Sequence, residues 1–123
     1  MNTNRTLELQ ADKLWSESQH LIWGDTCAKC GCPGGDPHHL IKRRIKATRH
    51  CMMNGVLLCK ICHRLAEDKQ ERFLKWLRYE FWDRWVWQHE NKSPKTMGAL
   101  AYKGELVKTI ESLKWFNDNW EGV

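Results

Sequence analysis

The chain has no acidic residue between Pro37 and Ala66, although Asp and Glu number 15 among its 123 residues. The same stretch holds seven of the 20 Lys and Arg residues, and the whole chain carries a net charge of +5. The positive excess therefore lies in this one segment. A surface that is basic only by chance explains such a bias poorly, so we expect a polyanionic partner that is bound mainly through phosphate contacts.

Other features are absent as well. The N-terminus reads MNTNRTLELQ and lacks a basic start followed by an apolar run, so we expect no secretory signal and a cytoplasmic location. No apolar stretch approaches the roughly 20 residues that span a membrane, and we expect no membrane association. The sequence contains no internal repeat and no low-complexity tract. Its length predicts a single domain over residues 1–123.

Six cysteines are present, and four of them form two Cys-x-x-Cys pairs, Cys27 with Cys30 and Cys59 with Cys62. In a reducing compartment such pairs favour a structural zinc ion over disulfides. The segment between them has few large apolar residues, so it needs a metal to hold its fold. Zinc in structural sites prefers four thiolates in tetrahedral geometry. Cys32 is an alternative ligand to Cys30, and we expect Cys51 to be a small buried apolar group.

A second set of polar residues does not belong to these cysteines. His38 and His39 are adjacent, so on an extended strand their side chains point to opposite sides. His63 follows Cys62 directly, and Glu67 lies four residues later on the same helical face. Imidazole is a suitable general base near neutral pH. A cation held by three protein groups keeps positions open for substrate and water.

The segment HHLIKRR, followed by Asn54 and then LLCKICH, resembles the HNH nuclease motif, also called the ββα-metal or His-Me finger. His39 precedes Asn54 by 15 positions, and Asn54 precedes His63 by nine. This spacing is similar to that of the colicin nuclease domains, and the pairs of cysteines are typical of small phage and bacterial members. The resemblance covers about residues 27 to 67.

The resemblance implies a role for each matching residue. His38 and His63 would bind a catalytic cation, His39 would be the general base, and Asn54 would orient that base. The family often has a further histidine at the position of Glu67, which here would be a third ligand and would favour Mg²⁺ or Mn²⁺. The expected products carry a 5′-phosphate and a 3′-hydroxyl. We expect the contacts to DNA phosphates to come from Lys42, Arg43, Arg44, Lys46, Arg49 and Arg64.

The predicted fold is α+β and mostly helical, with a small ββα-metal finger at residues 27–67 that is held by a four-cysteine zinc clamp. A helix over residues 5–23 precedes the finger, and a helical extension over residues 68–123 follows it. Hydrophobic spacing predicts strands at 38–45 and 56–58, one long helix from about 60 to 89, and a last helix from about 103 to 116, with the stripe Leu106, Val107, Ile110 and Leu113.

The predicted long helix is rich in aromatic residues on nearly its whole circumference. Packing of the flanking helices on two of its faces is the first explanation. A homodimer interface and stacking on unpaired bases are alternatives. The sequence thus predicts a metal-dependent HNH endonuclease that cuts DNA, encoded by a phage or a bacterium, with a phage packaging or recombination machine as a further partner. Two alternatives stay open, a zinc-ribbon nucleic-acid-binding or assembly protein without catalysis and a resolvase of branched DNA.

Overall fold

The computed structural model describes residues 3–93 and 96–121. In these residues it has five helices and one two-stranded antiparallel sheet, which agrees with the predicted mostly helical α+β class. No helix among them is long and apolar enough to cross a membrane. In chain order the elements are α1 (Thr3–Trp23), β1 (Asp36–His39), β2 (Gly55–Leu58), α2 (Lys60–Asp68), α3 (Gln70–Glu80), α4 (Trp82–Asn91) and α5 (Ala99–Asn119).

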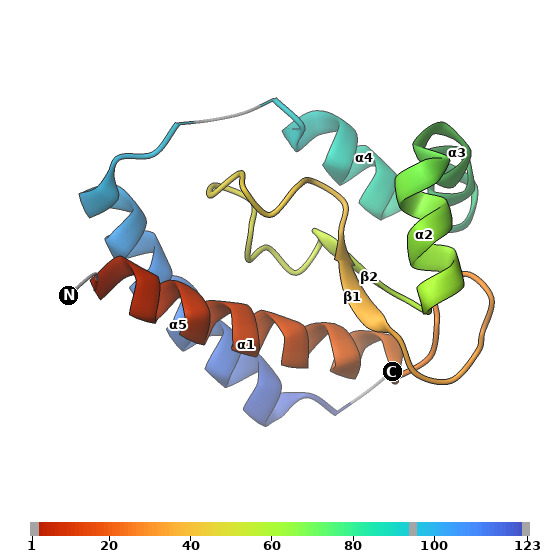
Figure 1. Ribbon diagram of the computed structural model, residues 1–123. Coiled ribbons are helices and arrows are strands. Elements are labelled where there is room, and N and C mark those ends of the chain that lie inside the picture. The colour runs from red at the N-terminus through yellow and green to blue at the C-terminus, as the bar shows by residue number, and fades with distance from the viewer. Residues whose placement is uncertain (1–2, 94–95, 122–123) are drawn as a thin grey trace.

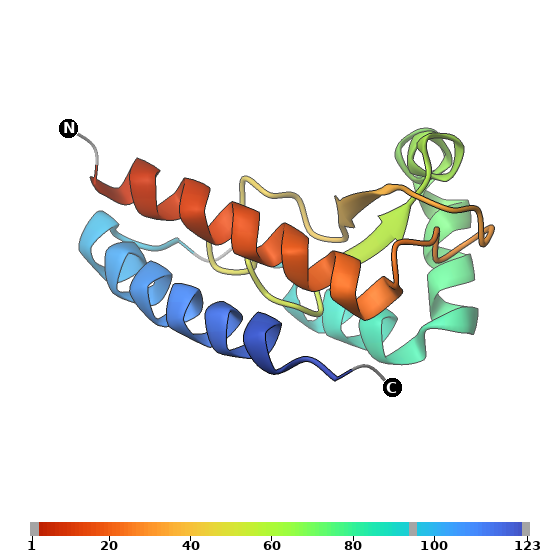
Figure 2. The same cartoon turned by 90° about the horizontal axis from the view of Figure 1, so that it is seen from below.

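Helices α1 and α5 lie side by side and run in the same direction (Figures 1 and 2). At one end the Asn4 side chain donates to the Ala99 carbonyl, and at the other Ser18 donates to Asn117. A small apolar cluster fills the space between them, formed by Ala11, Tyr102, Leu106 and Ile110. The predicted stripe of the last helix is correct except at Val107, which is 42% exposed.

The second apolar cluster lies under the sheet and is shared by β2, α2 and α3. In the register of the sheet His38 faces Val56 and His39 faces Gly55. Cys59 caps the N-terminus of α2, because its Sγ accepts a hydrogen bond from the Cys62 backbone N–H. The cap joins the second Cys-x-x-Cys pair to the start of α2, so this helix has a fixed direction relative to the sheet.

The single long helix predicted from residue 60 to 89 is wrong. The chain turns at Lys69 (φ −126°, ψ 55°) and again at Phe81 (φ −134°, ψ 66°), which separates α2, α3 and α4. A straight helix could bury only one stripe of its aromatic side chains. The two turns instead let α3 bury Phe73 and Leu77, while Arg84 of α4 lies over the Trp23 ring. No glycine or proline marks either turn, so the pattern had no signal for them.

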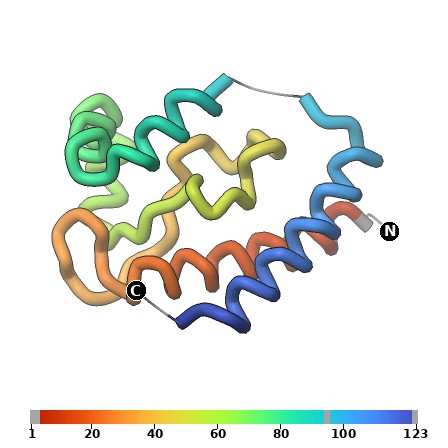
Figure 3. The backbone as a smooth tube through the Cα atoms, turned by 180° about the vertical axis from the view of Figure 1, so that it is seen from behind, coloured from red at the N-terminus to blue at the C-terminus, as the bar shows by residue number. Residues whose placement is uncertain are grey.

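The strand predicted from residue 38 to 45 is also wrong in extent, since β1 ends at His39. Beyond it, the backbone N–H and carbonyl of Ile41 are both hydrogen-bonded to the side chain of Asn54, at 2.6 and 3.0 Å. The next residues form a loop, residues 40–54, that connects β1 to β2 (Figure 3, yellow). We call it the β1–β2 loop below.

Candidate active site

The four predicted clamp residues come together, one pair from the segment before β1 and one pair from the start of α2. The Sγ atoms of Cys27, Cys30, Cys59 and Cys62 all lie within 4.8 Å of one another. Burial raises the pKa of Cys27, but hydrogen bonds from backbone groups of Cys30, Cys59 and Lys29 outweigh it and lower this pKa to about 6. These hydrogen bonds favour the thiolate of Cys27, the form that binds metals.

This cysteine clamp is placed to bind a metal ion such as zinc. Four thiol groups at mutual distances of this size match the donor set of structural zinc sites. Cys30 is part of the cluster, whereas the alternative ligand Cys32 is exposed. Cys51 is half-buried, and burial raises the pKa of its thiol.

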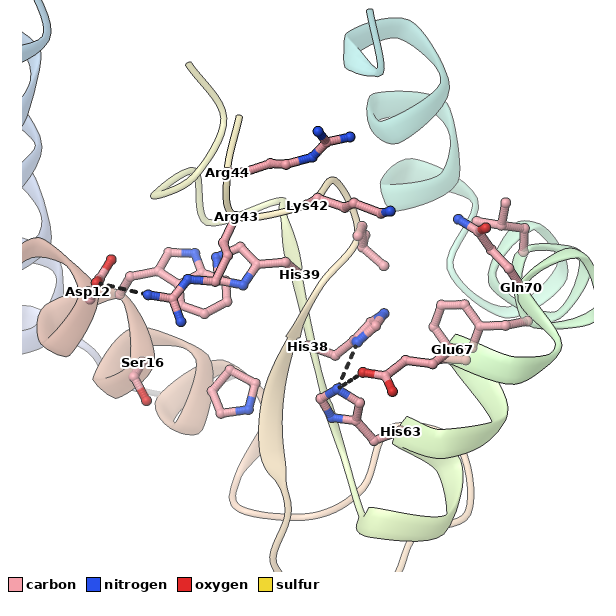
Figure 4. A pocket seen from close by; sticks show the side chains of 16 residues that line it. Asp12, Ser16, His38, His39, Lys42, Arg43, Arg44, His63, Glu67 and Gln70 are labelled. Carbon is pink, nitrogen blue, oxygen red and sulfur yellow. Dashed lines mark hydrogen bonds and ion pairs between the residues drawn. The ribbon is translucent and has the colours of Figure 1, made fainter. Parts of the chain in front are cut away.

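His38, His63 and Glu67 form a second cluster between β1 and α2 (Figure 4). The Nε2 atom of His63 lies 3.3 Å from Nδ1 of His38 and 3.2 Å from Oε1 of Glu67. Burial, helped by the nearby His63 and His39, lowers the pKa of His38 to about 4. His38 is therefore neutral near pH 7, as a metal-binding imidazole must be.

The two close pairs at His63 have the spacing of ligands that share a cation. Two ligands that are each about 2.1 Å from one ion, at angles between octahedral and tetrahedral, are separated by about 3.0 to 3.4 Å. Both measured distances at His63 are in this range. His38, His63 and Glu67 do not all gather at one point, however, because the four cysteines are the only tightly gathered group of three or more such ligands in the described part of the chain. The Glu67 side chain is 64% exposed.

His39 points away from His38, toward α1. Its ring stacks on the Trp15 ring, with centroids 4.0 Å apart and an interplanar angle of 16°. Its Nε2 donates to the Arg49 carbonyl oxygen at 3.0 Å, which leaves the lone pair on Nδ1. Burial lowers the pKa of His39 to about 4, despite the hydrogen bond to Arg49. The imidazole is neutral at pH 7 and can accept a proton.

Asn54 is fully buried and holds the β1–β2 loop closed. In addition to its two hydrogen bonds to Ile41, its Nδ2 donates to the Thr48 carbonyl at 3.0 Å. The predicted influence on His39 is therefore indirect. Asn54 fixes the path of the loop, and the Arg49 carbonyl in that loop contacts the imidazole.

These groups face one groove with a volume of about 830 Å³. The lining residues come from α1, β1, the β1–β2 loop, α2 and α3, and Figure 4 shows His38, His63 and Glu67 on one side with Lys42, Arg43 and Arg44 above them. All three basic side chains are exposed, but Arg43 is paired with Asp12 at 3.7 Å. The groove thus combines imidazoles with positive charge that is only partly paired, which suits a phosphate group.

The other predicted phosphate contacts lie elsewhere. Arg49 does not fit that role, because its guanidinium is 9% exposed and is paired with Asp12 at 2.7 Å. Lys46 is exposed, but its Nζ lies 4.7 Å from the centre of the Tyr102 ring. Arg64 is exposed on α2 and is not among the residues that line the groove.

Sequence reasoning missed the contribution of α1 to this groove. Asp12, Trp15 and Ser16 line it from one side, and Gln70 lines it from α3. Trp15 is only 4% exposed. Nothing in the local sequence pattern distinguishes a tryptophan that packs on core residues from one that stacks on the histidine of a groove.

Comparison with known proteins gave no match, since no family model, no curated protein and no solved structure is significantly similar to this chain.

Proposed function

We propose that this protein is a metal-dependent endonuclease of the HNH type that hydrolyses phosphodiester bonds in DNA. One observation carries the proposal: a neutral histidine with a free Nδ1 and a separate pair of neighbouring metal donors line the same basic groove. A purely structural zinc finger would need only the cysteine clamp. It has no use for the second cluster or for His39 at its side.

Each group of residues would have its own role in the reaction. Lys42 and Arg44 would hold phosphates on either side of the cut without reading base sequence. His38, His63 and Glu67 would hold the catalytic cation, which when bound supplies positive charge at the scissile phosphate and at the leaving oxygen. The cysteine clamp would bind zinc and keep α2 at a fixed angle to the sheet, so that His63 stays opposite His38.

His39 would act as the general base. Its Nδ1 takes a proton from a water molecule, and the water oxygen forms a bond to phosphorus. The bond between phosphorus and the 3′ oxygen breaks on the opposite side, and the 3′ oxygen gains a proton from solvent. The products are a 5′-phosphate and a 3′-hydroxyl. The hydrogen bond to the Arg49 carbonyl keeps the proton of the neutral ring on Nε2, so Nδ1 is the atom that accepts the proton of the water.

The test is nicking of supercoiled plasmid by the purified protein, with Mg²⁺ or Mn²⁺ and with a chelator. We expect nicked product only with the divalent cation, and a decrease of about 10²- to 10⁴-fold for His39→Ala. His89→Ala is the matched control, because His89 is exposed on α4 and does not line the groove. Linear duplex, single-stranded DNA and a four-way junction, assayed side by side, identify the preferred substrate.

The proposal is wrong if the zinc-loaded protein binds DNA but never cuts it in any of these assays. That result would assign the chain to zinc-dependent nucleic-acid-binding proteins without catalysis. Equal nicking by wild type and His39→Ala would instead trace the cleavage to a contaminant or to another base.

A further inference from the structure

Helix α1 lies outside the segment that resembles a nuclease, yet it contacts four consecutive residues of the β1–β2 loop. Asp12, Trp15 and Gln19 lie on one face of this helix, at the spacing of successive turns. Asp12 is paired with Arg49 and His50, the Trp15 Nε1 donates to the Cys51 carbonyl at 2.9 Å, and the Gln19 Nε2 donates to the Met52 carbonyl at 3.0 Å.

The contact with Arg49 is the strongest of these. The Nε and Nη2 atoms of Arg49 donate to the two carboxylate oxygens of Asp12, at 2.9 and 2.7 Å. Such a two-point pair fixes orientation as well as distance. The Arg49 Nη1 also lies 3.5 Å from Glu8, one turn earlier in α1, and Glu8 accepts a hydrogen bond from the Tyr102 hydroxyl of α5. The side chain of Arg49 is thus held by two acidic residues of α1.

Both neighbours of the His39 imidazole depend on this arrangement. The Arg49 carbonyl accepts a hydrogen bond from the His39 Nε2, and the Trp15 ring covers one face of the imidazole. The helix is seated directly on the strand pair at this point. A Cβ atom on Gly55, which faces His39 in the sheet, would lie only 2.5 Å from Gln19 Oε1 and 2.8 Å from the Trp15 ring.

We propose that α1 is a positioning element for the general base, with Trp15 and Asp12 as the positioning residues. The inference rests on the proposed nuclease function. A general base must be held close to its productive geometry, and a displacement of about 1 Å can cost about 10²-fold in rate. Trp15 sets the plane of the imidazole. Asp12 anchors the side chain of Arg49. It thereby sets the position of the Arg49 carbonyl, which accepts the hydrogen bond from the His39 Nε2.

A residue that only supports the fold would behave differently. Substitution of such a residue would lower the stability of the protein and the fraction of molecules that are active. Its fold-decrease in cleavage rate would then multiply with the fold-decrease caused by any other substitution. A residue that acts through His39 should lower kcat and leave the KM for DNA and the required Mn²⁺ concentration unchanged. It should also have no further effect once His39 is removed.

The experiment measures plasmid nicking by Trp15→Leu, Trp15→Phe and Asp12→Asn, each alone and combined with His39→Ala, after zinc content and melting have been checked. We expect Trp15→Leu and Asp12→Asn to lower kcat by about 10- to 10²-fold. Trp15→Phe keeps an aromatic face on His39, so it should retain more activity than Trp15→Leu. In the His39→Ala background none of the three should slow cleavage further. Glu17→Gln, an equal change of charge at an exposed position of α1, is the control.

The outcomes separate this inference from the proposed function. A wild type that never nicks DNA overturns both. A wild type that nicks, beside positioning variants with unchanged kcat, overturns the inference alone. Decreases in kcat that multiply with the decrease caused by His39→Ala also overturn the inference, since they would mean that Trp15 and Asp12 support only the fold. If Trp15→Leu does not fold, Trp15→Phe and Asp12→Asn decide the question.

Discussion

At the scale of single residues, adjacent histidines acquire different chemistry from their surroundings. His38 and His39 are neighbours on β1, and burial lowers the pKa of both to about 4. His38 lies beside a second imidazole and near a carboxylate, so a cation is its natural partner. His39 lies beside a carbonyl and an indole ring, and its Nε2 donates to that carbonyl, so this nitrogen carries a proton and does not bind a metal ion. Strand alternation alone produces this division of roles.

The two roles predict different responses to metal concentration. His63→Ala removes one donor from the proposed cation site, so it should weaken cation binding, and more Mn²⁺ should restore part of the cleavage rate. Glu67→Ala should behave in the same way but more mildly, because that carboxylate is largely exposed. His39→Ala should stay slow at every Mn²⁺ concentration. The measurement is cleavage rate against Mn²⁺ concentration for the three variants. Rescue of His39→Ala by metal, beside a His63→Ala protein that metal does not rescue, would reverse the assigned roles.

At the scale of elements, the sequence predicted best what depends on neighbours in the chain. The helical period of α1 and the paired cysteines were read correctly, because both are local patterns. The turns at Lys69 and Phe81 were missed, since they depend on contacts with residues distant in the sequence. Phe73 and Leu77 of α3 join the apolar cluster that includes Val56 and Leu58, and Arg84 of α4 donates to the Gly55 carbonyl. The early end of β1 was missed for a similar reason: the side chain that hydrogen-bonds Ile41 comes from Asn54, 13 residues later.

The cysteine clamp gives a prediction at this scale. Cys59→Ser removes one thiolate but keeps a residue that can cap α2, because serine is a good N-cap. Loss of metal is then the main consequence of the change. We expect the variant to lose zinc and the finger to melt, while α1 and α5 keep their helical signal through their own apolar cluster. Metal analysis and circular dichroism measure both effects. Cys32→Ser should retain one zinc per chain, and full zinc content in Cys59→Ser would refute the assignment.

The β1–β2 loop gives a second prediction. Lys42 and Arg44 line the groove and are exposed, so the double variant Lys42→Ala and Arg44→Ala should weaken binding to all DNA sequences alike. The plot of log affinity against log salt concentration should flatten by about one unit for each lost phosphate contact. Lys103→Ala with Lys114→Ala, two exposed lysines of α5, removes the same charge elsewhere. Equal salt slopes in the two double variants would show that the loop does not face the DNA.

At the scale of the whole molecule, the candidate site combines a local motif with distant support. The spacing of His38, His39, Asn54 and His63 was visible in the sequence. The role of Arg49 was not visible, because its partners Asp12 and Glu8 lie about 40 residues earlier. In the sequence these two acidic residues indicate only the solvent-facing side of a helix. A basic residue in a basic segment is predicted to bind phosphate, and only the fold shows that its charge is already paired. Long-range ion pairs of this kind leave no periodic signal.

The same network links folding to pH through His50. This residue is 6% exposed in its side chain and lies 2.7 Å from Asp12. Burial lowers the pKa of His50 below its ordinary value of about 6.5, although Asp12 opposes the shift. The unfolded chain therefore binds more protons than the native protein below about pH 6.5. The stability that His50 contributes is present above that pH and is lost as pH falls through its lowered native pKa, by at most about 1.4 kcal/mol per pH unit.

The free energy of unfolding, measured in urea without added Mg²⁺ or Mn²⁺ at about pH 7 and about pH 5, should therefore decrease less in His50→Gln than in wild type. Glutamine can still donate a hydrogen bond to Asp12 but cannot bind a proton, so the difference between the two proteins isolates the titration of this one side chain. The clamp thiolates and the groove histidines respond to pH equally in both. His89→Gln, at an exposed position on α4, should follow the wild type. An identical loss in wild type and His50→Gln would mean that His50 is protonated to the same extent in the folded and unfolded chain.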